Sequence, residues 1–358
     1  QFRRLEGETQ GTLGEFVNVD KQNITAAARA TAIWPLGDTI FSILSSKKRH
    51  ISSEFSYAAV RERKLLDAAT GYFEMVRWEL SVKILEKAVE ISKGLVKDLE
   101  ESVSLGKSFK GDLLRAQTQL AHNNIELSRA RMASKEASMR LATILNLEPL
   151  IELYSAKDEV VPLRLVKEEK LEVLLTQAIG RRHEIKAEQK EREAVKNESS
   201  SAHWGPLIPN IITDATWGEF GPNLTDTDGQ NTYSAGLGWK IGSGGLFDYG
   251  RTHLADARVK QAEINLRITA QRVKEEVASN YMLVNAQSEH MALAEDGVRY
   301  AEESLRLNQE RQRAGIGIPL EVIQAEEALT KAQLDHLLSV IAYNQSQFKL
   351  LWSIGEPL

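Results

Sequence analysis

Two related stretches decide the fold: LGKSFKGDLLRA at residues 105–116 and AGIGIPLEVIQA at residues 314–325. A glycine, an acidic residue and an alanine keep one offset of 209 positions between them. The matched pairs at that offset are Gly106 and Gly315, Asp112 and Glu321, Ala116 and Ala325, Tyr72 and Tyr281, and Leu120 and Leu329. An offset held without gaps indicates one structural unit used twice. Two long helical hairpins could also match through composition alone.

Each stretch lies between two long segments whose apolar residues recur every three or four positions. The first pair of segments covers residues 39–104 and 112–147, and the second covers residues 246–313 and 320–354. No proline occurs between Pro35 and Pro149, so the first helix can run for roughly 65 residues, about 100 Å. Helices of this length need long neighbours to bury their apolar stripe, as in a coiled coil. The sequence therefore predicts two antiparallel helical hairpins with glycine-bearing tips.

A pair of strands is expected ahead of each hairpin. Residues 24–34 alternate between apolar and polar positions, and residues 3–17 are their expected partner across a turn at residues 18–20. The second pair covers residues 211–220 and 233–241. The side chains expected on the outer apolar face are Trp34, Trp217, Tyr233, Leu237 and Trp239. Such strands fit a membrane barrel or an ordinary soluble sheet.

Three further local predictions complete the pass along the chain. Asp38 is a candidate N-cap for the first long helix. Residues 171–199 are expected to form one helix, in which His183 and Glu184 face apart and so make a helix cap or a surface pair rather than a metal site. The expected organisation is a first repeat at 1–148, a linker at 149–170 and a second repeat at 171–358.

Composition excludes several classes of function. The chain has 358 residues, a net charge of −5 and no cysteine, which argues against a nucleic-acid footprint and fits an oxidising compartment. No run of 18 apolar residues is present, so a membrane would have to be crossed by strands. No G-x-S-x-G motif, metal-spaced histidine pair or dinucleotide-binding glycine pattern occurs. We therefore expect no catalytic residue, no metal, no cofactor and no enzyme activity.

The order of these elements resembles the TolC family of bacterial outer-membrane efflux proteins. The local strings that carry the resemblance are LFDYGR at residues 246–251, RHEIKA at residues 182–187, the segment from Ala278 to Tyr281, and Gly315 followed by Glu321. The resemblance implies a mainly helical fold in which long antiparallel coiled-coil helices form an α-helical tunnel. It also implies four strands per protomer in a trimeric, twelve-stranded outer-membrane β-barrel.

The same resemblance assigns roles to particular residues. The tips Leu105, Gly106 and Lys107, and Ala314, Gly315 and Ile316, are the expected docking points for a periplasmic adaptor. Asp112 and Glu321 are expected to line the pore constriction with Gln324, which stands where TolC has a second acidic residue and so puts a double acidic ring in doubt.

The function implied is a passive exit duct, in the outer membrane and extending into the periplasm, for efflux or type I secretion. Its partners would be two further copies of the chain, the adaptor, an inner-membrane pump and outer-membrane lipid, with no nucleic acid. The family has a helix ahead of the first strand pair that this chain does not contain, and a lipid anchor or leader would lie before Gln1. The alternative is a soluble periplasmic coiled-coil adaptor or scaffold without a barrel.

Overall fold

The computed structural model describes residues 2–148, 150–156, 159–167, 169–223 and 225–358. It divides into two compact units, which are described separately. The first comprises residues 1–53 and 188–266, and the second comprises residues 54–187 and 267–358. The units join segments distant in sequence, so they cut across the two predicted repeats.

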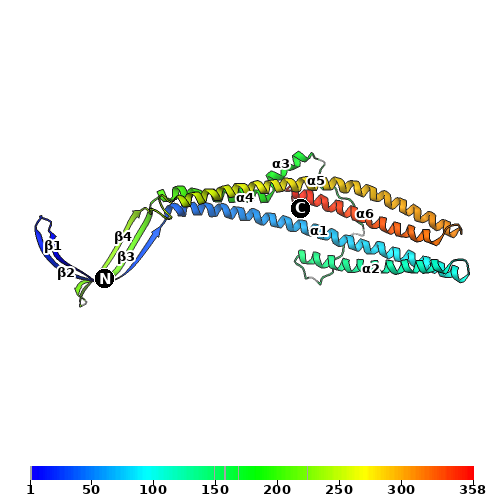
Figure 1. The fold of residues 1–358 in the computed structure, drawn as a ribbon, viewed down its shortest axis with the longest axis horizontal. Coiled ribbons are helices and arrows are strands. Elements are labelled where there is room, and N and C mark those ends of the chain that lie inside the picture. Colours follow the sequence, from blue (N-terminus) through cyan, green and yellow to red (C-terminus); the bar gives the residue numbers. More distant parts are fainter. Residues whose placement is uncertain (1, 149, 157–158, 168, 224) are drawn as a thin grey trace. The chain divides into compact units, whose positions relative to one another are not determined.

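The first unit contains a four-stranded antiparallel sheet (Figure 1). Its strands, in spatial order, are β1 (Phe2–Gln10), β2 (Phe16–Trp34), β3 (Asn210–Asn223) and β4 (Asp226–Gly238). The turn predicted at residues 18–20 is wrong, because those residues pair with β1 inside β2. The chain instead reverses between Gly11 and Glu15, where the Gly11 amide donates to the Glu15 carbonyl at 2.8 Å. Gly14 supplies a positive φ of 88° in this turn.

The register of the sheet places the predicted apolar residues opposite one another. Trp34 lies across from Ile211, which lies across from Leu237. Ala30, Ala215 and Tyr233 form a second such row on the same face. Since directly opposed residues of antiparallel strands share a face, the period-two pattern of the sequence becomes one continuous surface.

The helical part of the first unit begins where the strands end. It contains the first turns of α1 (Leu36–Ser104) and α5 (Tyr249–Arg313), the last turns of α4 (His183–Trp204) and a short 3₁₀ turn, η1 (Gly205–Leu207). At this junction the backbones approach so closely that a Cβ on Gly37 would lie 2.3 Å from the Gly205 carbonyl oxygen. Any side chain at Gly37 would therefore force the two segments apart.

Two predicted helix starts need correction. α1 begins at Leu36, so Asp38 lies inside its first turn, and its carboxylate binds Arg251 and Ser201 rather than capping the helix. α5 begins at Tyr249 rather than Leu246. Asp248 caps it, since its carboxylate accepts the amides of Arg251 at 3.0 Å and Gly244 at 2.6 Å.

The second unit contains most of both predicted hairpins, including their tips. The rest of α1 pairs with α2 (Lys110–Ile144), and the rest of α5 pairs with α6 (Pro319–Ser353). Gly106 and Gly315, at the two tips, adopt φ values of 71° and 76°. The core nearest the tips contains residues that match at the 209-residue offset, among them Val96 with Leu305 and Ala116 with Ala325. The prediction of a mainly helical fold with four strands in the chain is confirmed.

The predicted linker is irregular in backbone but packed against the helices. The Leu153 amide donates to Ser138 at 2.7 Å, and the Leu163 amide donates to the Asn344 side chain at 2.7 Å. Pro149, which was expected to open the linker, lies outside the described residues. The single helix predicted for residues 171–199 is wrong, because Arg182 breaks it into α3 (Leu171–Arg181) and α4. Within the described residues, no helix has an apolar stretch long enough to cross a bilayer.

Candidate functional site

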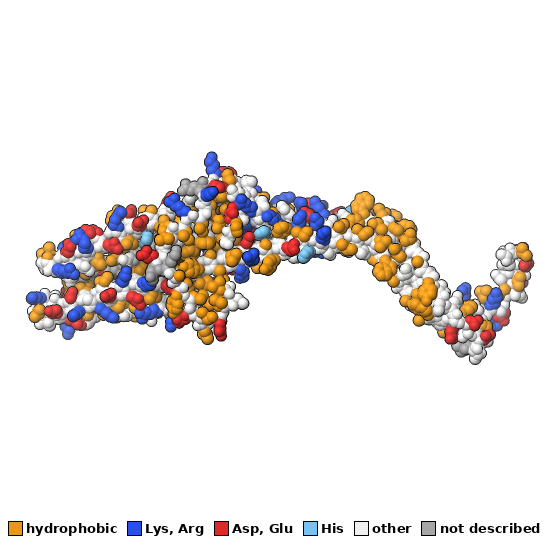
Figure 2. All heavy atoms as spheres, turned by 180° about the vertical axis from the view of Figure 1, so that it is seen from behind, with side chains coloured by type: hydrophobic (Ala, Val, Ile, Leu, Met, Phe, Trp, Pro, Cys, Tyr) orange, Lys and Arg blue, Asp and Glu red, His pale blue; other side chains and the backbone are white. Residues whose placement is uncertain are grey.

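One face of the sheet carries large apolar side chains that no described residue covers. Trp34 is 57% exposed and Leu237 is 66% exposed. Trp217 and Tyr233, on the same face, meet edge to face, and the indole Nε1 of Trp217 donates to the Tyr233 hydroxyl at 3.0 Å. Figure 2 shows hydrophobic side chains gathered over the strands, whereas the helices also carry many charged side chains. An apolar surface of this kind marks a contact with lipid or another protein.

The opposite face of the sheet is polar. Asp214 accepts hydrogen bonds from Arg29 at 2.9 Å and from Thr31 at 2.6 Å, across the β2–β3 pair. Ser234 lies opposite Asp214 on β4, and Thr216 lies opposite Thr232. The sheet therefore has one apolar face and one polar face.

Trp239 lies outside the strand in which the sequence placed it. β4 ends at Gly238, and the Trp239 indole donates to the carbonyl of Leu207 in η1 at 3.1 Å. The predicted strand residue Ile241 forms only an isolated bridge with Leu246. Trp239 remains exposed, and this hydrogen bond links its indole nitrogen to η1.

The hairpin tips are exposed and flank a groove within the second unit. Leu105 and Ile316 project into solvent. The groove has a volume of about 660 Å³ and receives Lys107 and Phe109 from one hairpin, and Gly315 from the other. The structure thus brings the two predicted docking tips to one recess, although they are 209 residues apart in sequence.

The two predicted constriction acids occupy equivalent places, each in the first turn of a returning helix. Each is paired with an arginine. Asp112 lies 3.2 Å from Arg115 on the same helix, and Glu321 lies 3.3 Å from Arg311 across the tip. Gln324 is exposed one turn further along α6. The local charge at each acid is therefore balanced within the chain.

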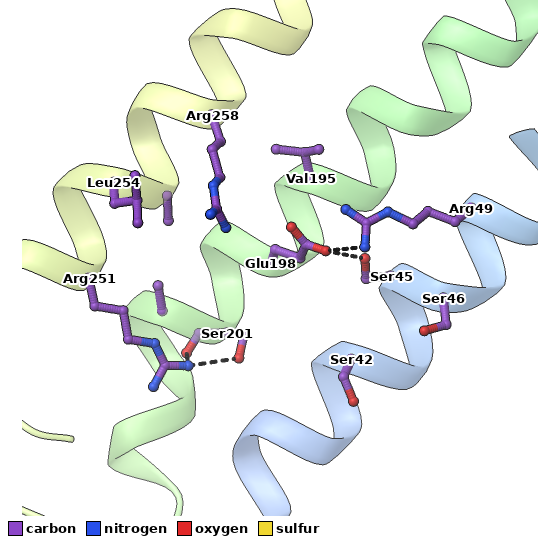
Figure 3. A pocket seen from close by; sticks show the side chains of 12 residues that line it. Ser42, Ser45, Ser46, Arg49, Val195, Glu198, Ser201, Arg251, Leu254 and Arg258 are labelled. Carbon is purple, nitrogen blue, oxygen red and sulfur yellow. Dashed lines mark hydrogen bonds and ion pairs between the residues drawn. The ribbon is translucent and has the colours of Figure 1, made fainter. Parts of the chain in front are cut away.

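A pocket of about 310 Å³ lies between α1, α4 and α5 in the first unit (Figure 3). Glu198 of α4 accepts Arg49 at 2.7 Å and Ser45 at 3.1 Å, both from α1. On the α5 side, Arg251 donates to Ser201 at 3.2 Å and to Asp38. Burial would raise the pKa of Asp38, but the hydrogen bonds and charge of Arg251 outweigh it and hold that pKa below its usual value. These arginines tie α4 to both long helices and are not free to bind an anion.

Arg182, at the break between α3 and α4, is buried and binds several side chains, which was not predicted from the sequence. The Arg182 guanidinium stacks 4.0 Å from the centre of the Trp352 ring and donates to Glu184 at 2.8 and 2.9 Å. It also lies 3.0 Å from Glu276. Burial would raise the pKa of Glu184, yet the Arg182 contacts lower it overall. The string RHEIKA was the only sequence signal for this cluster.

His183 turns away from Glu184, as their adjacent positions predict. Its Nε2 lies 3.1 Å from Glu62, and its ring stacks on Phe55. The described residues contain no group of three or more potential metal ligands.

A second buried polar cluster joins the two hairpins. Glu326 of α6 is only 1% exposed, and its carboxylate accepts a hydrogen bond from Ser92 of α1. Asn123 of α2 donates to the Ser92 hydroxyl at 2.7 Å. The sequence held a signal that was missed, because Glu326 stands in the apolar stripe of its helix between Val322 and Leu329.

Comparison with known proteins shows where this architecture recurs. The family model described as outer membrane efflux protein matches residues 174–356, just over half of the chain. Among solved structures, the outer-membrane channel OprN matches with a TM-score of 0.78 at 17% identity, over 99% of this chain and 80% of OprN. The outer membrane protein VceC of Vibrio cholerae matches at 0.75 and 18%, over 99% and 86%. The Campylobacter jejuni outer membrane channel CmeC matches at 0.76 and 16%, over 99% and 76%. A search of the curated proteins found no match.

Proposed function

The chain belongs to the outer membrane efflux protein family and is an exit duct of an efflux system, and we propose that it works as a passive homotrimer coupled to an adaptor and a pump. Proteins of this family are outer-membrane channels that extend into the periplasm. They generally work as trimers with adaptor and pump partners. The one observation that carries the proposal for this chain is the two-faced sheet, apolar on one side and polar on the other.

The open edges of the sheet support assembly of several copies into a closed barrel. β1 and β4 are the outer strands, and the described chain offers neither of them a second neighbour. In a bilayer, backbone groups without partners are too costly to persist, so such edges must be closed by further strands. Three copies would supply twelve strands and pair β1 of one copy with β4 of the next. The row of Trp34, Ile211 and Leu237 would then face lipid, and Arg29 and Asp214 would face the water-filled interior.

The hairpins supply the periplasmic part of the duct. The tips at residues 105–107 and 314–316 would receive the adaptor in the groove between them. Asp112, Glu321 and Gln324 would line the constriction near those tips. The chain would catalyse no reaction and bind no cofactor. A soluble adaptor is the weaker alternative, because it would leave the apolar face of the sheet in water.

A pair of arginine substitutions on opposite faces of β4 tests the membrane assignment. Leu237→Arg places a charge on the apolar face, where arginine near mid-bilayer costs about 2–4 kcal/mol per copy. We expect this variant to fail to assemble in the outer membrane, as measured by heat-resistant trimer in membrane fractions. Ser234→Arg is the matched control, since it lies on the same strand but on the polar face, and it should assemble normally. Equal assembly of both variants would contradict the assignment of the faces.

A further inference from the structure

The buried carboxyl group of Glu326 lies where two helical hairpins meet. It belongs to α6, whereas its hydrogen-bonding neighbours Ser92 and Asn123 belong to α1 and α2. On one side lies the apolar cluster that contains Leu95 and Val322, and on the other lies the cluster that contains Leu85 and Leu127. A carboxyl group in such surroundings has lost its contact with water, and apolar side chains and very few hydrogen-bond donors surround it instead.

The hydrogen bonds run in one direction and end on a single carboxyl oxygen. Gln119 donates to the Asn123 side-chain oxygen at 3.2 Å, Asn123 donates to Ser92 at 2.7 Å, and Ser92 donates to Oε1 of Glu326. Asn123 adds a longer contact of 3.4 Å to the same Oε1. The other oxygen, Oε2, is buried and accepts no hydrogen bond from the described residues. Two donors on one oxygen and none on the other stabilise a carboxylate anion poorly.

Among the described residues, no cation is paired with this carboxyl group. The pKa of Glu326 is raised by burial, which outweighs the opposing effect of the Ser92 hydrogen bond, and no charged neighbour shifts it further. From α5, Leu305 packs in the neighbouring apolar cluster that contains Leu95 and Val322. The next residue of that helix, Arg306, pairs with Glu303 and Glu310. The charged residues next to the cluster in sequence are all exposed, namely Lys93 on α1, His122 on α2, and Glu327 and Lys331 on α6.

The cluster is specific to one of the two repeats. At the 209-residue offset, Ser92 corresponds to Ala301 and Asn123 to Ala332, so alanine replaces both donors in the equivalent places. Gln117, the counterpart of Glu326, is exposed. The repeat therefore does not require an acid here, and the buried carboxyl is a local addition at the contact between the hairpins.

We propose that Glu326 packs in its neutral, protonated form and acts as a proton-dependent latch that holds α6 against α1 and α2. Ionisation places an unpaired charge between two apolar clusters, so it favours separation of α6 from its neighbours. The sign follows from the raised pKa: the packing is strongest in acid and weakens as the pH rises through that value. Salt-bridged carboxylates such as Glu184 behave in the opposite way. If the chain is the trimeric duct proposed above, the tip end of each hairpin pair loosens in alkali.

Hydrogen exchange of the purified full-length protein tests the latch without any assumption about transport. Between about pH 4, below the ordinary pKa of a glutamate, and about pH 8, after correction for intrinsic exchange rates, protection of the amides in residues 319–333 should fall by about tenfold for each unit by which burial raises the pKa. Glu326→Gln keeps the size of the side chain but cannot ionise, so its protection should stay high at both pH values. Glu327→Gln removes an exposed carboxylate one residue away and should keep the pH dependence of the unmodified protein.

Each remaining outcome overturns the proposal. An unmodified protein whose α6 is equally protected across this pH range has no latch. A pH dependence that persists in Glu326→Gln belongs to another group. Low protection of Glu326→Gln at both pH values contradicts the claim that a neutral side chain packs here. Because the measurement reports helix packing, it can succeed even if the channel assignment fails.

Discussion

At the scale of single residues, the two tip glycines lie at the ends of the hairpins, as the sequence predicts. Both adopt a positive φ, which side-chain-bearing residues reach only at a cost of about 1–2 kcal/mol. Close backbone contact does not require glycine there, because a Cβ at Gly106 or Gly315 would meet no described atom within 4 Å. Conformation therefore explains these glycines inside the protomer, and space is left at the tip for a partner.

Substitutions at Gly315 separate backbone strain from docking. Gly315→Ala introduces the strain alone and should keep most export activity. Gly315→Trp adds bulk at an exposed tip and should abolish export while the amount of trimer in the membrane stays unchanged. Export by cells carrying each variant, normalised to trimer, is the measurement. Full export by the tryptophan variant would show that docking occurs elsewhere.

The acidic residues near the tips make a second prediction at this scale. Asp112 and Glu321 are each paired with an arginine, so any contribution they made to a cation-selective ring would be smaller than that of two free acids. The double variant Asp112→Asn and Glu321→Gln should shift the reversal potential in a salt gradient towards lower cation selectivity. Glu126→Gln, which removes a charge further along α2, should leave it unchanged. An unaltered reversal potential in the double variant would remove these residues from the pore lining.

At the scale of elements, long periodic segments were predicted well and their ends were not. The four long helices and the faces of β2, β3 and β4 follow from apolar periodicity, which tertiary packing reinforces. The turn at Gly11–Glu15 was missed because the sequence around Asn18 and Asp20 is equally rich in turn formers. Asp38 was mistaken for a cap because Arg251, its partner, lies 213 residues away. Local sequence cannot reveal such partners.

The break at Arg182 was also missed, because its partners Glu276 and Trp352 lie far away in sequence. Replacing Arg182 tests how much this cluster contributes to stability. Arg182→Ala would leave Glu184 and Glu276 partly buried without their cation, which typically costs about 3–5 kcal/mol. Arg181→Ala, the adjacent control, removes a surface pair with Glu356 and should cost about 0–1 kcal/mol. Denaturant unfolding followed by circular dichroism measures both.

The pH dependence of that difference follows from Glu184. Its pKa is lowered in the folded protein, so the pair contributes stability above the unfolded pKa and loses it as the pH falls through the lowered value. The gap in stability between the unmodified protein and Arg182→Ala should therefore narrow in acid. A gap that is constant with pH would show that packing on Trp352, rather than the ion pair, accounts for the effect of Arg182.

At the scale of the whole molecule, the sequence predicts two repeats, and the structure groups the same residues into two compact units that each combine both repeats. Matched residues such as Ala116 and Ala325 meet in one core, which is how the internal repeat becomes a packed structure. The buried cluster around Glu326 breaks the repeat and could not be inferred from it. In the part of the chain that the structure describes, nothing covers the apolar face of the sheet or pairs with its two edge strands, and a trimeric barrel would do both.

The most direct test of the central claim is single-channel conductance of the full-length, detergent-extracted protein in a planar bilayer, with its mass determined in the same preparation. The account predicts a trimer that produces discrete conductance steps. A water-soluble monomer or dimer without conductance would contradict it and would make the strands an ordinary soluble sheet.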